Sequence, residues 1–229
     1  RETAKVCMTT AFCVWCHLAA LTYLRNSDNP FLKNDVLPQL ENGVKLGATG
    51  LSNAMKYYSG LEKLHLTAEK TEEGYIVNGT LPAVSNLGNR HYFGAIATID
   101  TREVMVLVST NASGLEMTER LGFIGVNGSA TYTCKFENVL IPNDFVISED
   151  AKAFCDIIRP TFIYYQVPLG AGVIAAAADG IEKVKAKQNG CNDFLKVQAT
   201  ELRSHHERIE AELNQLASNL TLKDVVNTR

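Results

Sequence analysis

Two cysteines and a histidine near the start of the chain have the spacing of a haem attachment site. Residues 13–17, Cys-Val-Trp-Cys-His, match the Cys-x-x-Cys-His pattern of c-type haem proteins. They fall in an apolar stretch, residues 6–24, which we expect to form a buried helix in which thiols behave as small hydrophobic groups. No strand precedes them, as thioredoxin-like redox chemistry would require. We therefore expect Cys13 and Cys16 to be inert core thiols.

A second group of possible ligands lies near the end of the chain. His205, His206 and Glu207 have Glu201 and Glu210 at helical spacing, and residues three or four apart share one face of a helix. Charged residues crowd the whole segment from 196 to 212, however, and such a pattern is typical of a solvated, salt-bridged face. We expect no metal site here.

A third polar group follows a predicted strand pair. Apolar and polar residues alternate over 64–69 and again over 75–78, and residues 71–74 supply a polar turn, which together predict a β-hairpin. Asn78-Gly79 adds turn chemistry. The residues after it, 81–86, are expected to form a loop in which hydroxyl and amide side chains stand beside apolar ones. This loop could line a flat polar ligand, and an ordinary surface hairpin is the alternative.

The elements that must position these groups fall into three regions. Residues 1–43 are predicted to be helical, with a buried helix and a second, amphipathic helix over 31–40. Strands dominate residues 44–147, enough for a small β-barrel. Residues 148–229 return to helix, which Pro160 and Pro168 should kink or restart. The expected fold class is α+β and multidomain: a helical segment, a central β-barrel domain and a carboxy-terminal helical bundle.

Length and composition exclude several classes of protein. The chain has 229 residues, 46% of them hydrophobic, so it can bury a sizeable core and is not disordered. Its net charge of −3 gives no electrostatic basis for binding nucleic acid. No uninterrupted apolar run reaches the ~18 residues of a membrane span. We find no secretory signal, and we expect a cytoplasmic protein with reduced thiols.

Several segments resemble the acyl-CoA dehydrogenase family, in the family's order. Residues 75–80 and 83–86, Tyr-Ile-Val-Asn-Gly-Thr and Ala-Val-Ser-Asn, resemble its strand pair and the Trp-Ile-Thr-Asn segment after it. Residues 37–43 resemble the Leu-Pro-x-Leu-x-x-Gly stretch that ends the amino-terminal helical domain. Residues 136–142 resemble its Phe-x-x-Val-x-Val-Pro strand, and residues 168–170 the start of its carboxy-terminal bundle. Against the family pattern, the chain begins inside the first helical domain and stops inside the last.

The resemblance implies a site for FAD at the end of the hairpin. In the family, a Ser or Thr at the position of Ser85 places its hydroxyl and amide against the reactive edge of the flavin, where donors stabilise the negative charge of the reduced ring. Ala83 stands where the family has a Trp that packs on the flavin, and Val84 lies between the two. The missing Trp removes a large stacking surface.

A second stretch of the implied site lies upstream. Residues 53–60 occupy the place of the family's Thr-Glu-Pro-Gly-x-Gly-Ser-Asp segment but lack its glycines. The resemblance implies that Leu51, Ser52 and Asn53 bring their backbone to the flavin. Ser59 aligns with the family's Ser, which contacts phosphate or acyl-CoA. Lys56 could bind phosphate, and a solvated turn is the alternative.

The resemblance implies dehydrogenation of an acyl-CoA thioester between its α and β carbons, with hydride transfer to FAD. No catalytic base can be assigned, because the family's first-helix glutamate position is taken by Pro160, with Asp156 one turn earlier. Implied partners are acyl-CoA, an electron-transfer partner and further copies of the chain in a dimer or tetramer. Two alternatives remain: a non-catalytic subunit that keeps the fold as a partner surface, and a relative of the flavin monooxygenases or nitroalkane oxidases.

Overall fold

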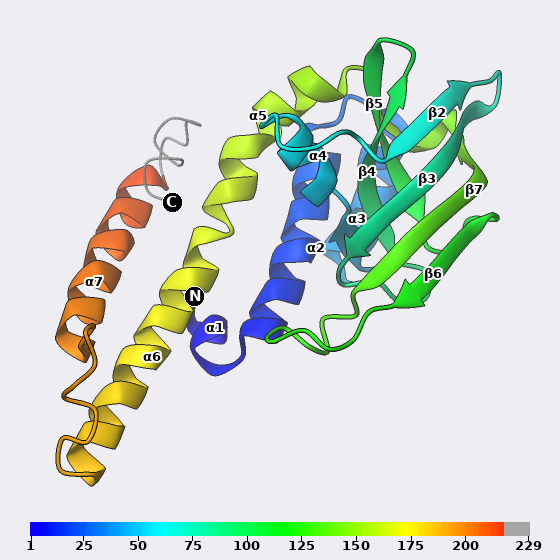
Figure 1. The fold of residues 1–229 in the computed structure, drawn as a ribbon. Coiled ribbons are helices and arrows are strands. Elements are labelled where there is room, and N and C mark those ends of the chain that lie inside the picture. Colours follow the sequence, from blue (N-terminus) through cyan, green and yellow to red (C-terminus); the bar gives the residue numbers. More distant parts are fainter. Residues whose placement is uncertain (218–229) are drawn as a thin grey trace. The chain divides into compact units, whose positions relative to one another are not determined.

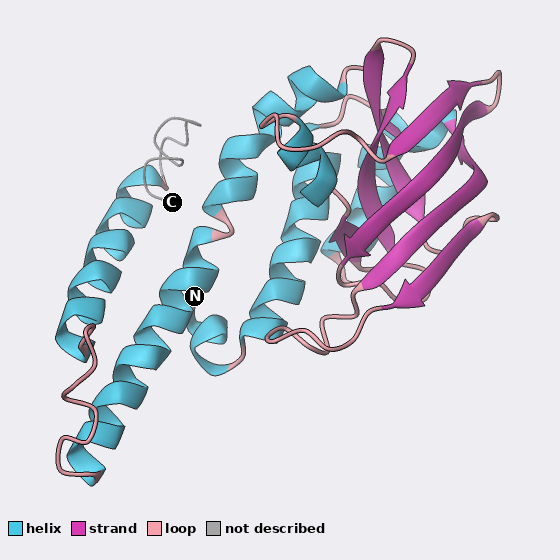
Figure 2. Ribbon diagram, in the orientation of Figure 1, coloured by secondary structure: helices cyan, strands magenta, loops and turns pink. Residues whose placement is uncertain are grey.

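The computed structural model describes residues 1–217, and the chain divides into two compact units. Cys13–Ile158 form one unit, and Arg1–Phe12 form the other with the chain from Arg159 onward. The expected order of a helical segment, a strand-rich region and carboxy-terminal helices is confirmed (Figure 2). The division at residues 43 and 147 stays a prediction.

The strands of the larger unit form one mixed eight-stranded sheet (Figure 1). Their order is β6-β7-β3-β2-β4-β5-β8, with β1 paired to β4. The pairs β1–β4 and β2–β4 are parallel and the others antiparallel. The strands are β1 (Gly47–Thr49), β2 (Leu66–Lys70), β3 (Gly74–Val84), β4 (Tyr92–Ile99), β5 (Arg102–Ser109), β6 (Leu115–Glu119), β7 (Tyr132–Pro142) and β8 (Val146–Ser148).

The predicted hairpin is confirmed as β2 and β3, which pair from Leu66 with Gly79 to Lys70 with Tyr75. The expectation for the residues after it was wrong, because β3 continues through Pro82 to Val84 where a loop was predicted. Asn78-Gly79 makes no turn but lies inside this strand, at a register shift against β7. Gly79 has a φ of +126°, and a Cβ there would lie 2.2 Å from the carbonyl oxygen of His65. Between the pairs Val77–Val139 and Gly79–Phe136, β7 has two residues where β3 has only Asn78, so β7 carries the bulge. Glycine is needed at position 79 because of its positive φ and the close approach of His65.

Apolar side chains of the sheet form the core of this unit, including the fully buried Tyr75 and Phe93. Helix α2 (Met8–Asn26) is buried around most of its length, with Cys16, Ala19 and Leu24 inaccessible to solvent. The amphipathic helix expected over 31–40 is split into a π-helix, Leu32–Val36, and α3, Leu37–Glu41. Shorter helical pieces are α4 (Ser52–Tyr57) and a 3₁₀ turn at Asn143–Phe145, and α5 (Ala151–Tyr164) follows β8.

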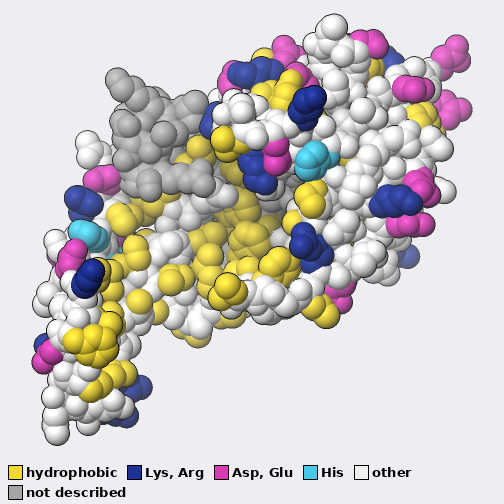
Figure 3. Space-filling view, in the orientation of Figure 1, with side chains coloured by type: hydrophobic (Ala, Val, Ile, Leu, Met, Phe, Trp, Pro, Cys, Tyr) yellow, Lys and Arg dark blue, Asp and Glu magenta, His cyan; other side chains and the backbone are white. Residues whose placement is uncertain are grey.

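In the smaller unit, α1 (Glu2–Val6) and α7 (Ala199–Leu216) both pack on α6 (Val167–Lys187). A Cβ on Gly172 of α6 would lie 2.7 Å from the Cβ of Ala4, so glycine permits the close approach of α1. Arg203 ties α7 to α6 by ion pairs of 2.8 Å with Asp179 and 2.6 Å with Glu182. Large hydrophobic side chains nevertheless stay exposed on this unit, among them Phe194 between α6 and α7. Figure 3 shows hydrophobic side chains gathered on the surface of α6 and α7.

The segment Ala151–Lys187 is long and apolar enough, by length and composition, to cross a membrane. From the sequence we expected no apolar run long enough for a membrane span. The longer segment arises because α5 and α6 are taken together. Core helices of soluble proteins have the same composition. Within its own unit, α6 uses its small apolar residues for packing, with Leu169, Ala171 and Ala178 buried.

Candidate functional site

Three strand ends meet at a cluster of hydroxyl groups in the larger unit. Thr49, the last residue of β1, forms an isolated antiparallel β-bridge with Ser85, which directly follows β3. The hydroxyl of Tyr23, from α2, lies 2.6 Å from Thr49 Oγ1. The amide of Leu51 donates to the same oxygen over 3.3 Å. Tyr23 is fully buried, and its burial raises its pKa well above the usual value, so the phenol is neutral.

A second line of hydroxyls meets Ser85 from the start of β7. Ser85 Oγ lies 2.7 Å from Thr131 Oγ1, which lies 2.8 Å from Ser129 Oγ. Ser129 is 1% exposed and Thr131 6%, whereas Ser85 is only half-buried. The amide of Asn86 donates to the carbonyl of Ser129 over 2.8 Å, which holds the two segments in register. Ser85 is thus the solvent-reaching end of a buried hydroxyl chain.

Two histidines and an asparagine fix the backbone beside this cluster. Asn86, at a φ of +64°, donates its side-chain amide to the carbonyl of Gly47 over 2.9 Å. The carbonyl of Asn86 accepts a hydrogen bond of 2.9 Å from His91 Nδ1, which therefore carries a proton. His17 Nδ1 accepts from the amide of Gly47 over 2.9 Å and is therefore bare. Desolvation, with His91 as a further cause, lowers the pKa of His17 against the raising effect of a backbone contact at Leu40.

The structure places the other predicted site residues around the cluster or away from it. Val84 points into the core and is fully buried, so its side chain is closed to a ligand. Ala83 is half-buried. Leu51 is buried and brought to Thr49 by its amide. Ser52 begins α4 and is exposed.

Asn53 and Ser59 make local bonds. Asn53 is 4% exposed, and its amide group donates to Glu62 over 2.8 Å and to the carbonyl of Lys63 over 2.9 Å. Its oxygen accepts from the amide of His65 over 2.9 Å. Both amide protons of Asn53 are used in holding this loop. Ser59 donates its hydroxyl proton to the carbonyl of Met55 over 2.8 Å. The roles of Asn53 and Ser59 in binding a ligand stay predictions.

Lys56 lies 3.5 Å from Glu62, an exposed pair. The ammonium group of Lys56, which the sequence suggested for binding phosphate, is therefore already paired with a carboxylate in this structure. Exposed ion pairs of this kind are weak because solvent screens them, so Glu62 does not prevent Lys56 from binding a phosphate.

The chain is similar in sequence to acyl-CoA dehydrogenases. It is 27% identical over 127 residues to the mitochondrial isovaleryl-CoA dehydrogenase of Arabidopsis thaliana, a match covering 52% of this chain and 30% of that protein. Apo-form PigA has the same fold, with a TM-score of 0.77 and 17% identity over 95% of this chain and 61% of that one. The Bacillus anthracis acyl-CoA dehydrogenase complexed with FAD gives a TM-score of 0.75 at 18% identity, covering 95% and 40% of the two chains. No family model matches the sequence.

The chain resembles the acyl-CoA dehydrogenase family in sequence and shares its fold. It spans about a third of the length of the isovaleryl-CoA dehydrogenase that it matches. FAD is the cofactor of the acyl-CoA dehydrogenase family. The sequence resemblance predicts the flavin contact at residues 83–86, and the chain of hydroxyl groups ends within this segment, at Ser85.

Whether this acyl-CoA dehydrogenase relative can hold a flavin depends on what Ser85 and its neighbours offer. The polar edge of a flavin needs hydrogen-bond donors, and the half-buried hydroxyl of Ser85, with buried hydroxyls behind it, is a group that can donate. The aromatic platform is missing, since Ala83 replaces it. The site fits the polar edge of the ring and provides little stacking on its face.

The family's catalytic base has no clear counterpart in the described residues. Pro160 lies inside α5. Asp156, one turn earlier, is exposed and forms an ion pair of 2.5 Å with Lys152. No group of three His, Cys, Asp or Glu side chains in residues 1–217 could hold a metal ion, and His206 Nε2 lies 2.9 Å from Glu210.

The cysteines of the Cys-x-x-Cys-His motif lie in α2, and all six cysteines are free thiols. Cys16 is fully buried, and desolvation raises the pKa of its thiol, which keeps it protonated. Cys13 is half-buried and donates weakly to the carbonyl of Ser129 over 3.9 Å. Burial of this kind suits packing better than haem attachment.

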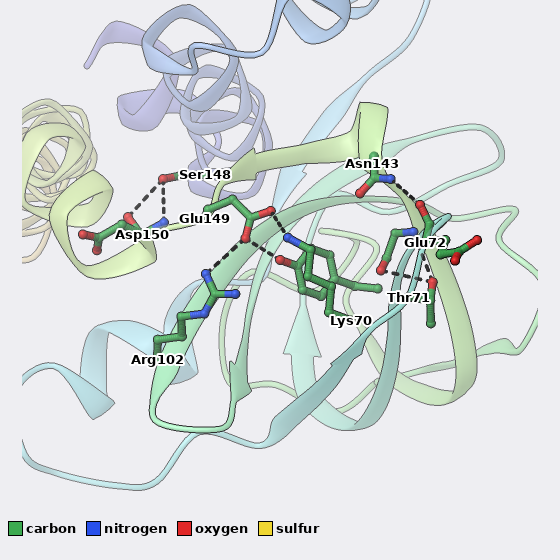
Figure 4. A network of polar contacts seen from close by, with 10 residues as sticks. Lys70, Thr71, Glu72, Arg102, Asn143, Ser148, Glu149 and Asp150 are labelled. Atoms are coloured by element: carbon green, nitrogen blue, oxygen red, sulfur yellow. Dashed lines mark hydrogen bonds and ion pairs between the residues drawn. The ribbon is translucent and has the colours of Figure 1, made fainter.

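A polar network fastens the end of β8 to the sheet (Figure 4). Glu149 accepts hydrogen bonds from Lys70 over 3.0 Å, from Arg102 over 3.3 Å and from the hydroxyl of Tyr75. Burial raises the pKa of Glu149, but the hydrogen bonds from Tyr75 and Lys70 lower it by more, so the pKa lies below its usual value. The network is structural, because its groups satisfy one another.

Sequence reasoning missed four residues of the hydroxyl cluster as site residues: Tyr23, Thr49, Ser129 and Thr131. One signal was available for the last two. Ser129 and Thr131 are two apart immediately before an alternating strand, and such residues lie on one face. Nothing local pairs Tyr23 with Thr49, because the two lie on elements that meet only in the folded chain.

Proposed function

We propose that the chain is an FAD-binding, acyl-CoA dehydrogenase-like flavoprotein that removes hydrogen from the α and β carbons of an acyl-CoA thioester. One observation supports this most directly. Ser85, at the family's flavin-contact position, is the half-exposed end of a line of hydroxyls that are otherwise buried.

FAD, when bound, would accept a hydride from the β carbon of the substrate. The chain's own part is to bind the polar edge of the ring and to stabilise negative charge there. Ser85 would donate its hydroxyl proton in a hydrogen bond, and the short chain of hydroxyls behind it would hold the donor in place. A carboxylate must take the α-proton in such a reaction, and we assign no described residue to that role.

The visible spectrum of the purified protein tests the flavin assignment. The protein as isolated, and the apo-protein after addition of FAD, should both show the two absorption bands of a bound flavin. Anaerobic addition of isovaleryl-CoA should then bleach the long-wavelength band of the oxidised flavin. A protein that takes up no FAD would contradict the proposal. A Soret band instead would support haem at Cys13 and Cys16.

A non-catalytic subunit with the same fold is the second candidate. Pro160 at the first-helix base position and Ala83 in place of the stacking Trp both favour it. Stable FAD binding without any bleaching by acyl-CoA would select this candidate over the enzyme.

The proposed partners follow from the same family. They are an acyl-CoA, an electron-transfer partner that reoxidises the flavin, and further copies of the chain. Six free thiols suit a reducing compartment, and we propose the cytoplasm.

A further inference from the structure

The hydroxyl of Thr131 takes part in two hydrogen bonds but has one proton. Its oxygen lies 2.7 Å from Ser85 Oγ and 2.8 Å from Ser129 Oγ. It must therefore accept in at least one of these bonds. If Ser85 gives its proton to Thr131, no proton of Ser85 is left for a ligand. If Thr131 gives its proton to Ser85, the proton of Ser85 is free to point outward.

We propose that Thr131 is a positioning residue that turns Ser85 into an outward hydrogen-bond donor. In the proposed arrangement Ser129 donates to Thr131, Thr131 donates to Ser85, and Ser85 donates to the flavin. This inference rests on the proposed function, because it deepens the role of Ser85 in flavin binding.

Burial and backbone structure favour an ordered chain. Ser129 and Thr131 are 1% and 6% exposed, so water competes little for their hydroxyls and the bonds are strengthened in the low dielectric. The backbone of Thr131 is also held, since its carbonyl accepts the amide of Arg120 over 2.8 Å. Hydrogen bonds in a chain polarise one another, so a donor backed by two more should bind negative charge better than a lone serine.

The effect should appear most strongly in reduced flavin, which carries more negative charge than oxidised flavin. Removing the Thr131 hydroxyl should weaken binding of reduced FAD more than binding of oxidised FAD. A tenfold difference between the two affinities would lower the midpoint potential of the flavin by about 30 mV, the two-electron conversion.

Three variants of the full chain test this: Thr131→Val, Thr131→Ser and Thr133→Val. Thr131→Val keeps the shape but removes the hydroxyl, and Thr131→Ser restores it. Thr133→Val is the matched control, two residues along β7, whose hydroxyl donates to the carbonyl of Pro82. For each we would measure the Kd of FAD for the apo-protein, the midpoint potential of the bound flavin and the thermal midpoint.

We expect Thr131→Val to raise the Kd about tenfold and to lower the midpoint potential, while Thr131→Ser and Thr133→Val resemble the wild type. A purely structural role would lower the thermal midpoint without changing the potential. If Thr131→Val does not fold, Thr131→Ala takes its place.

Two results would overturn the inference. If the potential of Thr131→Val equals that of the wild type while Ser85→Ala shifts it, Ser85 acts without Thr131. If the wild type binds no FAD, the proposed function fails, and this inference fails with it.

Discussion

Tyr23 and Thr49 share the shortest hydrogen bond of the hydroxyl cluster, 2.6 Å between the phenol oxygen and Thr49 Oγ1. The two residues come from α2 and β1. Because Tyr23 is fully buried, the bond that fixes the end of β1 is sealed from water.

Replacing Tyr23 with phenylalanine should therefore destabilise the protein. The ring still fills its space, but Thr49 loses a partner in a buried site, at a cost of about 1 to 3 kcal/mol. Urea denaturation of Tyr23→Phe against the wild type measures this. Tyr57→Phe is a suitable control, because the hydroxyl of Tyr57 lies on a less buried surface and bonds only to Glu103. Equal losses in the two variants would contradict the prediction.

The stability of the larger unit should fall in mild acid because of His17. Its folded pKa lies below the usual 6.5, so the folded state prefers the neutral ring. The stability that this preference contributes is present above about pH 6.5 and is lost as the pH falls through the lower folded pKa. Protonation also removes the acceptor for the Gly47 amide.

Denaturation curves between pH 8 and pH 5 for the wild type and His17→Gln would test this. The variant should show a flatter dependence on pH in that range. His91 is the titratable neighbour to control for, and His91→Gln should be measured alongside. An identical pH dependence in His17→Gln would rule His17 out.

Asn53 should hold the loop after α4 closed. Its side chain makes three hydrogen bonds to residues 62–65, and it is nearly inaccessible to solvent. Asn53→Ala should cost about 1 to 3 kcal/mol and leave its bonding groups unpaired. Limited proteolysis should then cut within residues 56–65 faster than in the wild type. Asn42→Ala, at an exposed position, is the control and should cut like the wild type.

Glu149→Gln should weaken the network at β8 only slightly. Its side chain is 45% exposed, so the charged pairs contribute about 0 to 1 kcal/mol after screening by solvent. The folded pKa of Glu149 lies below its usual value, so this stability is present above pH 4.5 and is lost as the pH falls further. The difference between variant and wild type should shrink in acid. A loss larger than 2 kcal/mol at neutral pH would show that the pair is worth more than an exposed one.

Thiol labelling of the folded protein should separate the six cysteines by exposure. Cys7 and Cys191 are exposed, whereas Cys16, Cys134 and Cys155 are buried. Hydrogen bonds from Thr10 lower the pKa of Cys7, which favours its thiolate. Mass spectrometry of peptides after a short pulse of alkylating reagent should show Cys7 first and Cys16 unmodified. Rapid labelling of Cys16 would contradict the buried helix that holds it.

The elements were easier to predict than the site. Alternation of apolar and polar residues located the β2–β3 hairpin, and the apolar stretch of residues 6–24 located α2, because both patterns are set by local geometry. The sequence also predicts, through its resemblance to the family, that residues 83–86 contact the flavin. It could not give the hydroxyl cluster, because Ser85 and Thr131 are 46 residues apart and meet only through sheet pairing. The split of the second helix at Val36 was equally hidden, since a π-helix depends on packing.

Pro82 lies in a part of β3 that β2 does not reach. Pairing with β2 ends at Gly79, while β3 continues to Val84 against β7 alone. One side of this stretch is therefore an open strand edge, on which another chain could add by backbone hydrogen bonds. A proline has no N–H and cannot join such an addition. The hydroxyl site is thus flanked by a strand edge at which a proline opposes the pairing of a second sheet.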